Sequence, residues 1–437
     1  MGERGAIMTI YVVKPGDSPW AIARRFGVSV ESLSRANGLA ELPGLVIGQA
    51  LVVPTTEMAY RVQPGDSVYS ISRKFGVSTG AIISLNKLAP PYMIMPGMVL
   101  RIPQKSKNYG YIETNAYIEP STPEIETRQV NSVGEYLTFI SPFTYKVKAD
   151  GSLVPIKDET IIKESGKFNT APLMVIANFG AETFETALAS AILRNEAVQD
   201  TLIKNVLSTM NTKNYYGVNV DFERISPDDR ERYNAFLRKL TAAAHAQGYV
   251  VSTALAPKTS ASQEGAWYSA HDYKAHGEIV DFVIIMTYEW GWSGGPPLPV
   301  APIPQVRAVL NYAVSVIPRK KILMGIPLYG YDWQLPYMPR GTTYAKRVSP
   351  QDAYRIAYNR GAIVKYDSTA LAPYFNYYDS KGVQHIIWFE DARSAQAKLL
   401  LVNEYGLRGA SYWVLGPSFP QSWELLDDMY NIVKVVK

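Results

Sequence analysis

Strand-length apolar runs alternate with amphipathic segments along most of this 437-residue chain. From about residue 130 onward, seven such runs recur, and most are separated by stretches with helical spacing of apolar residues. The runs are YLTFISPFTY, PLMVIANF, YYGVNVDFE, YVVSTALAP, VDFVIIMTYEW, KILMGIPLYGYDW and GASYWVLG. Strands that are nearly continuous in apolar residues and alternate with helices predict a parallel sheet covered by helices. Over roughly 300 residues, this pattern favours a closed (β/α)8 barrel.

The alternative is an open, doubly wound sheet, but no Gly-rich dinucleotide loop follows any of the runs to support it. The eighth strand of a barrel is hard to find, and LVPI, which begins at Leu153, is the candidate. Between about residues 340 and 390 the alternation is interrupted by one helix and short β-rich runs, which predict a small α+β insertion. The barrel domain is therefore expected to span residues 130–437 with this insertion included.

The N-terminal region follows a different pattern, a repeat without gaps. YVVKPGDSPWAIARRFGVSVESLSRANGL begins at Tyr11, and YRVQPGDSVYSISRKFGVSTGAIISLNKL begins at Tyr60, 49 residues later. Each copy predicts a short strand, a Pro-Gly-Asp turn, two short helices and a closing strand, LVVP or LRIP. The two copies are expected at residues 9–55 and 58–104, and the polar segment 105–129 is expected to be a linker.

Both copies resemble LysM domains, which bind glycans that contain N-acetylglucosamine, such as peptidoglycan and chitin. The resemblance covers nearly all of residues 9–104 and rests on the repeated PGDS and FGVS motifs. It implies a βααβ fold with a sugar site between the loop after the turn and the loop before the closing strand. The implied sugar-binding residues are Gly16, Asp17, Ser18, Leu45 and Ile47 in the first copy, and Gly65, Asp66, Ser67, Ile94 and Met95 in the second. For Asp17 and Asp66, the alternative that they only shape the turn stays open.

Composition narrows the possible partners. The formal net charge of +5 is too mild for a nucleic-acid-binding surface. The chain has no cysteine and its four histidines are scattered, so neither a metal nor another cofactor is expected. No apolar run is long enough to span a membrane, and the N-terminal MGERGAIMTIYVV lacks the features of a secretory signal peptide. We therefore expect a monomer whose partner is a glycan rather than nucleic acid or a membrane.

The strongest chemical signal lies in the run YYGVNVDFERI, residues 215–225. Asn219, Asp221 and Glu223 alternate with apolar residues, so they point to one face of a predicted strand at its carboxyl end. Two carboxylates this close cannot both ionise cheaply, so we expect a shared proton and a raised pKa for Glu223. A protonated Glu at the mouth of a barrel is a general acid. No second carboxylate is evident at the separation of ~5 Å or more that a nucleophile or base needs, which indicates a nucleophile within the substrate.

This run is similar to the signature D-G-x-D-x-D-x-E of glycoside hydrolase family 18, with Tyr216 and Asn219 in place of the first two acids. The resemblance covers about residues 130–437. It implies that Glu223 protonates the glycosidic oxygen while Asp221 orients the 2-acetamido group of the substrate. The acetamido oxygen then attacks the anomeric carbon, and water opens the resulting oxazolinium ion with retention. Asn219 cannot relay a proton but can still form hydrogen bonds, so activity with an altered pH profile is expected.

Other residues of the implied site come from later strands. The resemblance implies that Tyr288 hydrogen-bonds the acetamido group and that Trp413 lies under the reacting sugar. Glu289 and Tyr331 are implied as further polar contacts in the cleft. An indole suits the apolar face of a pyranose, since stacking covers aromatic area that is costly to expose.

Glycan-binding repeats beside an acetamido-dependent glycosidase imply a polymer that contains N-acetylglucosamine. Cleavage after N-acetylmuramic acid would force its 3-O-lactyl group into the reacting subsite, so cleavage after N-acetylglucosamine is expected. The combination resembles the spore cortex-lytic enzymes of endospore-forming bacteria, which implies action on cortex peptidoglycan in germination and a location in the spore coat or cortex. Two alternatives stay open: a chitinase that acts on chitooligosaccharides, and a non-catalytic peptidoglycan-binding coat protein.

Overall fold

Eight parallel strands close into a barrel in the computed structural model, which describes residues 8–54, 57–75, 77, 79–103, 107, 109–338 and 344–436. The strands neighbour one another in the order β5, β6, β9, β10, β11, β12, β13 and β19, and β19 pairs with β5 to close the ring. Their bounds are β5 (Tyr111–Ile118), β6 (Phe139–Pro142), β9 (Ala171–Ala177), β10 (Gly217–Asp221), β11 (Val250–Leu255), β12 (Phe282–Ile285), β13 (Ile322–Pro327) and β19 (Gly409–Trp413). The barrel expected from the alternation of strands and helices is confirmed.

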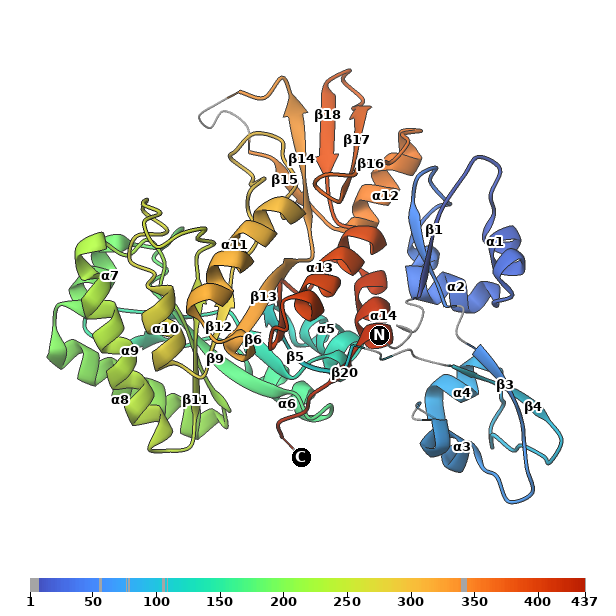
Figure 1. Cartoon of the computed structure of the whole chain (residues 1–437), viewed down its shortest axis with the longest axis horizontal. Coiled ribbons are helices and arrows are strands. Elements are labelled where there is room, and N and C mark those ends of the chain that lie inside the picture. Colours follow the sequence, from blue (N-terminus) through green and yellow to red (C-terminus); the bar gives the residue numbers. More distant parts are fainter. Residues whose placement is uncertain are drawn as a thin grey trace.

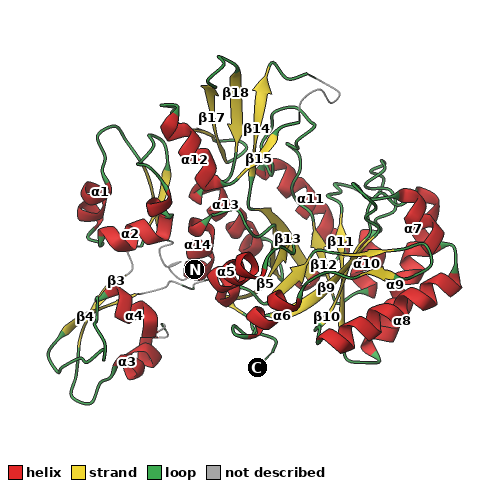
Figure 2. Cartoon of the chain, turned by 180° about the vertical axis from the view of Figure 1, so that it is seen from behind, coloured by secondary structure: helices red, strands yellow, loops and turns green. Residues whose placement is uncertain are grey.

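The barrel strands are apolar on both faces because each face packs on a different cluster. Along β9, Leu173 and Val175 join the cluster inside the barrel, while Met174 and Ile176 join the cluster under the helices. The helices surround the strands (Figures 1 and 2). They are α5 (Pro123–Val133), α6 (Glu159–Gly166), α7 (Thr186–Leu193), α8 (Glu196–Lys213), α9 (Arg230–His245), α10 (Tyr273–Ile279), α11 (Ile303–Val316), α13 (Ala392–Glu404) and α14 (Pro420–Met429). No helix in the described part of the chain is long and apolar enough to cross a membrane.

The eighth barrel strand is β5, which lies inside the segment 105–129 that the sequence pattern assigns to a linker. The barrel therefore begins near residue 111, and the placement of a barrel strand at LVPI is wrong. The LVPI run contains β8 (Leu153–Val154), which forms a hairpin with β7 (Tyr145–Val147) beside the barrel. The sequence YIETNAYI looks too polar for a barrel strand, but its three polar side chains, Glu113, Thr114 and Asn115, find partners once the barrel closes. Asn115, for example, donates to Ser411 at 2.9 Å and accepts from Ser141 at 2.7 Å.

The insertion between β13 and β19 is a five-stranded antiparallel sheet with one helix. Its strand order is β15, β14, β18, β17 and β16, and α12 packs on it. The bounds are β14 (Gly330–Leu335), β15 (Lys346–Val348), α12 (Pro350–Asn359), β16 (Lys365–Asp367), β17 (Ala372–Tyr378) and β18 (Gln384–Trp388). The insertion begins at residue 330 rather than 340, because the run KILMGIPLYGYDW contains two strands, β13 and β14, instead of one.

Both N-terminal copies have the expected βααβ fold. The first consists of β1 (Thr9–Val12), α1 (Pro19–Phe26), α2 (Val30–Asn37) and β2 (Ala50–Val53), with a short 3-10 helix, η1 (Leu39–Glu41). The second consists of β3 (Glu57–Arg61), α3 (Val68–Phe75), α4 (Thr79–Leu85) and β4 (Val99–Pro103). A matching Asn ties the second helix of each copy to its closing strand. The side-chain amides of Asn37 and Asn86 each donate to two backbone carbonyls at 2.7–2.8 Å.

Candidate active site

The turn that contains Glu223 follows β10 and is held by side chains from other elements. The Asn178 side chain accepts from the Glu223 N–H and donates to the Glu223 carbonyl, both at 2.9 Å. His271 accepts from the backbone N–H of Ala256 at Nδ1, so its Nε2 donates to the Phe222 carbonyl at 3.0 Å. Burial lowers the pKa of His271 to about 4, which keeps the ring neutral with this arrangement of protons. The backbone that presents Glu223 is therefore fixed before substrate arrives.

The next residue, Arg224, takes a left-handed backbone conformation with φ of 52°. A non-glycine residue in this region stores strain and persists only where its surroundings enforce it. Here the Thr186 hydroxyl donates to the Arg224 carbonyl at 2.6 Å. The guanidinium group lies over the ring of Trp267, 5.6 Å from its centroid.

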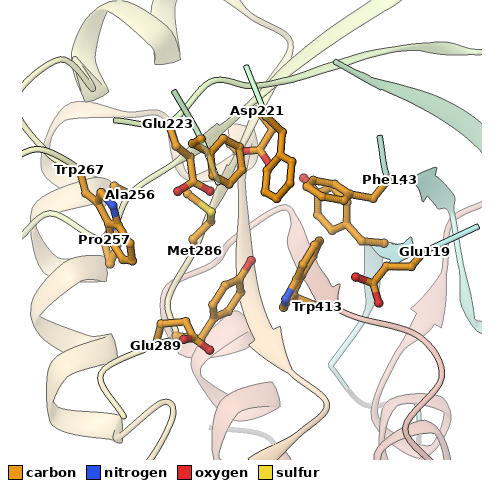
Figure 3. Close-up of a pocket in the computed structure, with 15 residues that line it drawn as sticks. Glu119, Phe143, Asp221, Glu223, Ala256, Pro257, Trp267, Met286, Glu289 and Trp413 are labelled. Carbon is orange, nitrogen blue, oxygen red and sulfur yellow. The ribbon is translucent and has the colours of Figure 1, made fainter. Parts of the chain in front are cut away.

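A cavity of about 260 Å³ opens at the carboxyl ends of the barrel strands. In Figure 3, Asp221 and Glu223 lie along one side of it, Glu289 and Trp413 lie opposite, and Trp267 and Glu119 lie at its two ends. The lining side chains are mostly aromatic or carboxylate. They come from Tyr117, Glu119, Phe143, Phe179, Phe184, Asp221, Glu223, Ala254, Ala256, Pro257, Trp267, Met286, Tyr288, Glu289 and Trp413. Flat aromatic walls with a few carboxylates suit a sugar, which presents apolar faces and a polar rim.

The two acids of the signature lie together in this cavity. Burial raises the pKa of Asp221, and burial followed by repulsion from Asp221 raises the pKa of Glu223 well above its ordinary value. The buried Oδ1 of Asp221 has no hydrogen-bond partner among the described residues. A buried acceptor without a donor is energetically unfavourable, so this oxygen can accept a hydrogen bond from a ligand in the cavity.

Asn219 lies beneath the acid pair and does not line the cavity. Its Oδ1 accepts from the Tyr117 hydroxyl at 2.9 Å, and its Nδ2 donates to the Ser252 Oγ at 2.9 Å. Burial raises the pKa of Tyr117 well above 10, so this phenol stays a donor. The amide thus links β10 to strands β5 and β11. Its oxygen and its nitrogen each have a hydrogen-bond partner, and neither partner is Asp221.

The remaining residues implied by the family resemblance gather around the acid pair, with one exception. Tyr288 and Glu289 follow β12, Trp413 ends β19, and all three line the cavity. The indole of Trp413 is held by edge contacts, with its ring centroid 4.9 Å from that of Phe143. Tyr331 does not line the cavity and donates instead to Glu289 at 3.0 Å. A second hydroxyl, from Tyr329, also donates to Glu289, so Tyr331 positions that carboxylate.

Several residues that line the cavity are not predicted from the sequence. Glu119 directly follows β5, whose position the sequence pattern did not reveal, and Phe143 directly follows β6. Trp267 lies in the long loop after β11. The usable signal for Glu119 and Phe143 was their position just after a strand, since barrel sites are built from those loops. No group of three His, Cys, Asp or Glu that could hold a metal occurs among the residues with described positions.

The implied sugar-binding turns of the LysM copies have strong structural roles. The Asp17 Oδ2 accepts from the Tyr11 hydroxyl and from the Lys14 N–H, both at 2.7 Å. Asp66 repeats this with the Tyr60 hydroxyl at 2.8 Å and a backbone N–H at 2.7 Å. Backbone hydrogen bonding is the main cause that lowers the pKa of both acids. These contacts favour turn shaping as the role of the two acids.

Neighbouring residues complete each turn. Gly16 and Gly65 take left-handed backbone conformations, with φ of 84° and 87°. The Ser18 and Ser67 hydroxyls accept from backbone N–H groups of the helices that follow, at 3.1 and 3.0 Å. The opposite loops present partly exposed Leu45 and Ile47 in the first copy and Ile94 and Met95 in the second.

Comparison with known proteins places the whole chain. The profile of Glycosyl hydrolases family 18 matches residues 116–417, and the LysM domain profile matches residues 11–54 and 60–103. The chain is 50% identical to the Cortical fragment-lytic enzyme of Bacillus subtilis (strain 168), over 98% of this chain and 99% of the relative. It is 46% identical to the enzyme of the same name from Bacillus anthracis, over 98% of this chain and 100% of the relative.

A solved structure agrees with this assignment. The crystal structure of the Bacillus megaterium QM B1551 spore cortex-lytic enzyme SleL is similar with a TM-score of 0.83 and 43% sequence identity. The similarity covers 99% of this chain and 100% of that chain, so it includes both LysM copies and the barrel.

Proposed function

Because the chain belongs to glycosyl hydrolase family 18 and contains two LysM domains, we propose that it is a retaining N-acetylglucosaminidase that hydrolyses spore cortex peptidoglycan. Membership of the family makes it a glycoside hydrolase. Full-length relatives named Cortical fragment-lytic enzyme support cortex peptidoglycan as the substrate, the spore as the place of action and germination as the time. The LysM copies then hold the enzyme on glycan strands, with sugar contacts from the backbone of their Gly-Asp-Ser turns and from the opposite loops.

The observation that carries this proposal is the unpartnered Oδ1 of Asp221 beside a Glu223 with a raised pKa. In the proposed mechanism, protonated Glu223 donates its proton to the glycosidic oxygen as the bond to the anomeric carbon breaks. The carbonyl oxygen of the substrate's 2-acetamido group forms the new bond to that carbon. The N–H of the same acetamido group donates to Asp221. Tyr288 donates to the same acetamido group, and Trp413 supports the apolar face of the sugar.

The second half of the reaction reverses these roles. The oxazolinium ion lies over Trp413 while the ionised Glu223 removes a proton from water. The water oxygen bonds to the anomeric carbon, the acetamido group is restored, and the product keeps its original configuration. Glu289 is proposed to contact a sugar hydroxyl, with Tyr331 holding its carboxylate in place.

The choice of N-acetylglucosamine as the reacting sugar follows from space and charge. A muramic acid residue in the reacting subsite would bring the bulk and negative charge of its 3-O-lactyl group into a cavity whose lining includes Asp221 and Glu289. Repulsion between like charges in a water-poor cavity disfavours that arrangement. N-acetylglucosamine has the required acetamido group and lacks the lactyl acid.

A digestion experiment tests the proposal. The full-length enzyme is incubated with purified spore cortex peptidoglycan, new reducing ends are reduced, and the terminal sugar is identified by mass spectrometry. We expect reduced N-acetylglucosamine from the wild-type enzyme and no product from Glu223→Gln. Reduced muramic acid would contradict the cleavage site. Release of chitooligosaccharides from chitin with little action on cortex would favour the chitinase alternative, and unchanged behaviour of Glu223→Gln would favour the non-catalytic one.

The pH profile tests the role of the acid pair. Asn219→Asp adds a carboxyl group beneath Asp221, so its negative charge would raise the pKa of Glu223 further. Because Glu223 must be protonated to act, the alkaline limb of the kcat profile is expected to move to higher pH, by about one unit. An unshifted or downward-shifted limb would show that position 219 is electrostatically separate from the general acid. Asn219→Ser, which adds no acid, is the control.

A further inference from the structure

The cavity has a different charge at each of its ends. Glu119 lies at the end of the cavity beyond Trp413, where its carboxylate pairs with Arg347 at 3.5 Å, and Glu289 lies on the wall opposite Glu223. The opposite end contains Trp267 with Arg224 over its ring. A negatively charged substituent is therefore attracted more strongly at the Trp267 end, because the cation at the other end already pairs with Glu119.

The proposed mechanism assigns a sugar to each end. The reacting sugar lies on Trp413, and Glu223 reaches the oxygen that bridges to the next sugar. In Figure 3, Glu223 lies between Trp413 and Trp267. The leaving sugar is therefore placed at the Trp267 end, against Arg224.

Arg224 also differs from the other cations near this end of the cavity. Lys258 is buried and turns its ammonium group to the carbonyls of His271 and Ala261 at 3.3 and 3.5 Å. Arg230 pairs with Asp272 at 2.7 Å. The Arg224 guanidinium has no ion pair or hydrogen bond within the part of the chain that the structure describes. Its donors are therefore available to a ligand.

The position of Arg224 is also enforced rather than accidental. Its left-handed backbone is held by Thr186, and the two preceding carbonyls are held by Asn178 and His271. The ring of Trp267 then supports the planar guanidinium, which is the geometry that leaves its edge free for a carboxylate. A flexible surface arginine would need none of these contacts.

We propose that Arg224 and Trp267 form a specificity site for a carboxylate on the leaving sugar. This inference rests on the proposed function, since it takes the leaving sugar to be N-acetylmuramic acid. That sugar bears a 3-O-lactyl acid, either free or amide-linked to a peptide that ends in carboxylates. Arg224 binds this acid with two parallel N–H donors, and Trp267 packs on the sugar.

The electrostatics of the general acid agree with this assignment. The charge of Arg224 opposes the rise in the pKa of Glu223, which by itself lowers the fraction of Glu223 that is protonated. A bound carboxylate would neutralise Arg224, so the pKa of Glu223 would rise when an acidic leaving sugar is in place. An acidic leaving sugar thus favours both its own binding and the protonated state of Glu223 that the first step requires.

The test compares two forms of one substrate. Soluble peptidoglycan fragments are used either unchanged or with their carboxylates converted to neutral amides, and kcat/KM is measured from new N-acetylglucosamine reducing ends. For the full-length wild-type enzyme, we expect kcat/KM on the acidic form to exceed that on the amidated form about tenfold. Arg224→Gln should lower this ratio to near one, and Arg224→Lys should keep an intermediate ratio.

Two further variants guard the interpretation. Trp267→Leu removes the supporting ring without changing the residue next to Glu223, and it should also lower the ratio. Arg238→Gln removes the same charge from an exposed position on α9 and should leave the ratio unchanged. A wild-type ratio near one, or an Arg224→Gln ratio equal to that of the wild type, would overturn the proposed site. Failure of the wild type to release N-acetylglucosamine ends from either form would instead overturn the proposed function.

Discussion

The first LysM copy packs on the barrel through its closing strand β2, whereas the second copy exposes the matching strand β4. In β2, Ala50 and Val52 are fully buried and belong to the same hydrophobic cluster as the barrel helices. The corresponding residues of β4 are Val99, which is 53% exposed, and Arg101, which is also exposed. The inward residues of both strands, such as Leu51 and Leu100, fill the small cores of their own copies.

Polar contacts reinforce the packing of the first copy. The Gln351 side chain on α12 donates to the Asn37 carbonyl at 2.8 Å, and the Val364 N–H donates to the Ile47 carbonyl at 3.0 Å. Figure 1 shows this copy beside α12, α13 and α14, with the second copy farther along the chain at the lower right. Two domains of one fold are thus placed differently: the first packs on the barrel and its insertion, and the second presents the matching strand to solvent.

The largest expected effect comes from placing a charge in this interface. Val52→Arg gives the first copy the residue type that stands at the corresponding position of the second. We expect the free energy of unfolding to fall by about 3 kcal/mol, since a buried charge without a partner is strongly unfavourable. Urea unfolding of the full chain measures it. The control is Val99→Arg, which adds the same charge to exposed β4 and should change stability by less than about 0.5 kcal/mol. Equal effects of the two variants would show that β2 is not a docking surface.

The contrast between Val52 and Arg101 is visible in the aligned repeats, but the repeats do not show which part of the molecule covers Val52. An apolar residue on the outer face of a closing strand indicates that something covers it, without saying what. The covering residues, on α13 and α14, lie more than 300 residues away in the sequence, and their pairing depends on tertiary packing. The βααβ fold itself was predictable because its turns and helix caps are local.

The catalytic domain shows the same division. The gathering of Asp221, Glu223, Tyr288 and Trp413 around one cavity was predictable because each lies at or just after the carboxyl end of a recognisable parallel strand, whereas their individual roles rest on the family resemblance. The side chains that hold the catalytic turn, such as Asn178 and His271, were missed since they act through backbone groups of a distant segment. The strand β5 was missed because its polar residues find buried partners only in the closed barrel.

A smaller effect on stability is expected where the backbone of the first LysM copy approaches the backbone of the insertion. Gly48 and Gly97 occupy corresponding positions with φ of 85° and 90°, so an alanine at either costs about 1–2 kcal/mol in strain. A Cβ on Gly48 would overlap the carbonyl oxygen of Val364 in the insertion, whereas a Cβ on Gly97 meets no described atom within 4 Å. We expect Gly48→Ala to destabilise the chain by about 2 kcal/mol more than Gly97→Ala. Thermal unfolding of the two variants measures the difference, and equal losses would mean that the loop moves away from Val364 freely.

The smallest expected effect concerns glycan binding. It tests whether packing on the barrel limits the glycan affinity of the first LysM copy. The proposed sugar loop of the first copy contains Ile47, which is 37% exposed and whose carbonyl is held by the insertion. The same loop in the second copy contains Met95, which is 70% exposed and free to cover a sugar. Losing the apolar contact of one such side chain should weaken binding by about 0.5–1 kcal/mol, or roughly two- to fivefold.

We therefore expect Met95→Ser to weaken binding to insoluble peptidoglycan within that range, and Ile47→Ser to weaken it less. Both changes are made in Glu223→Gln enzyme so that the glycan is not cut, and affinity is measured by co-sedimentation. A larger loss from Ile47→Ser would mean that the docked copy is the main sugar-binding domain, with the insertion shaping its loop. The second copy would then act as a spacer. The copy that packs on the barrel would be the one that binds glycan, although the structural contrast between the two copies would stay the same.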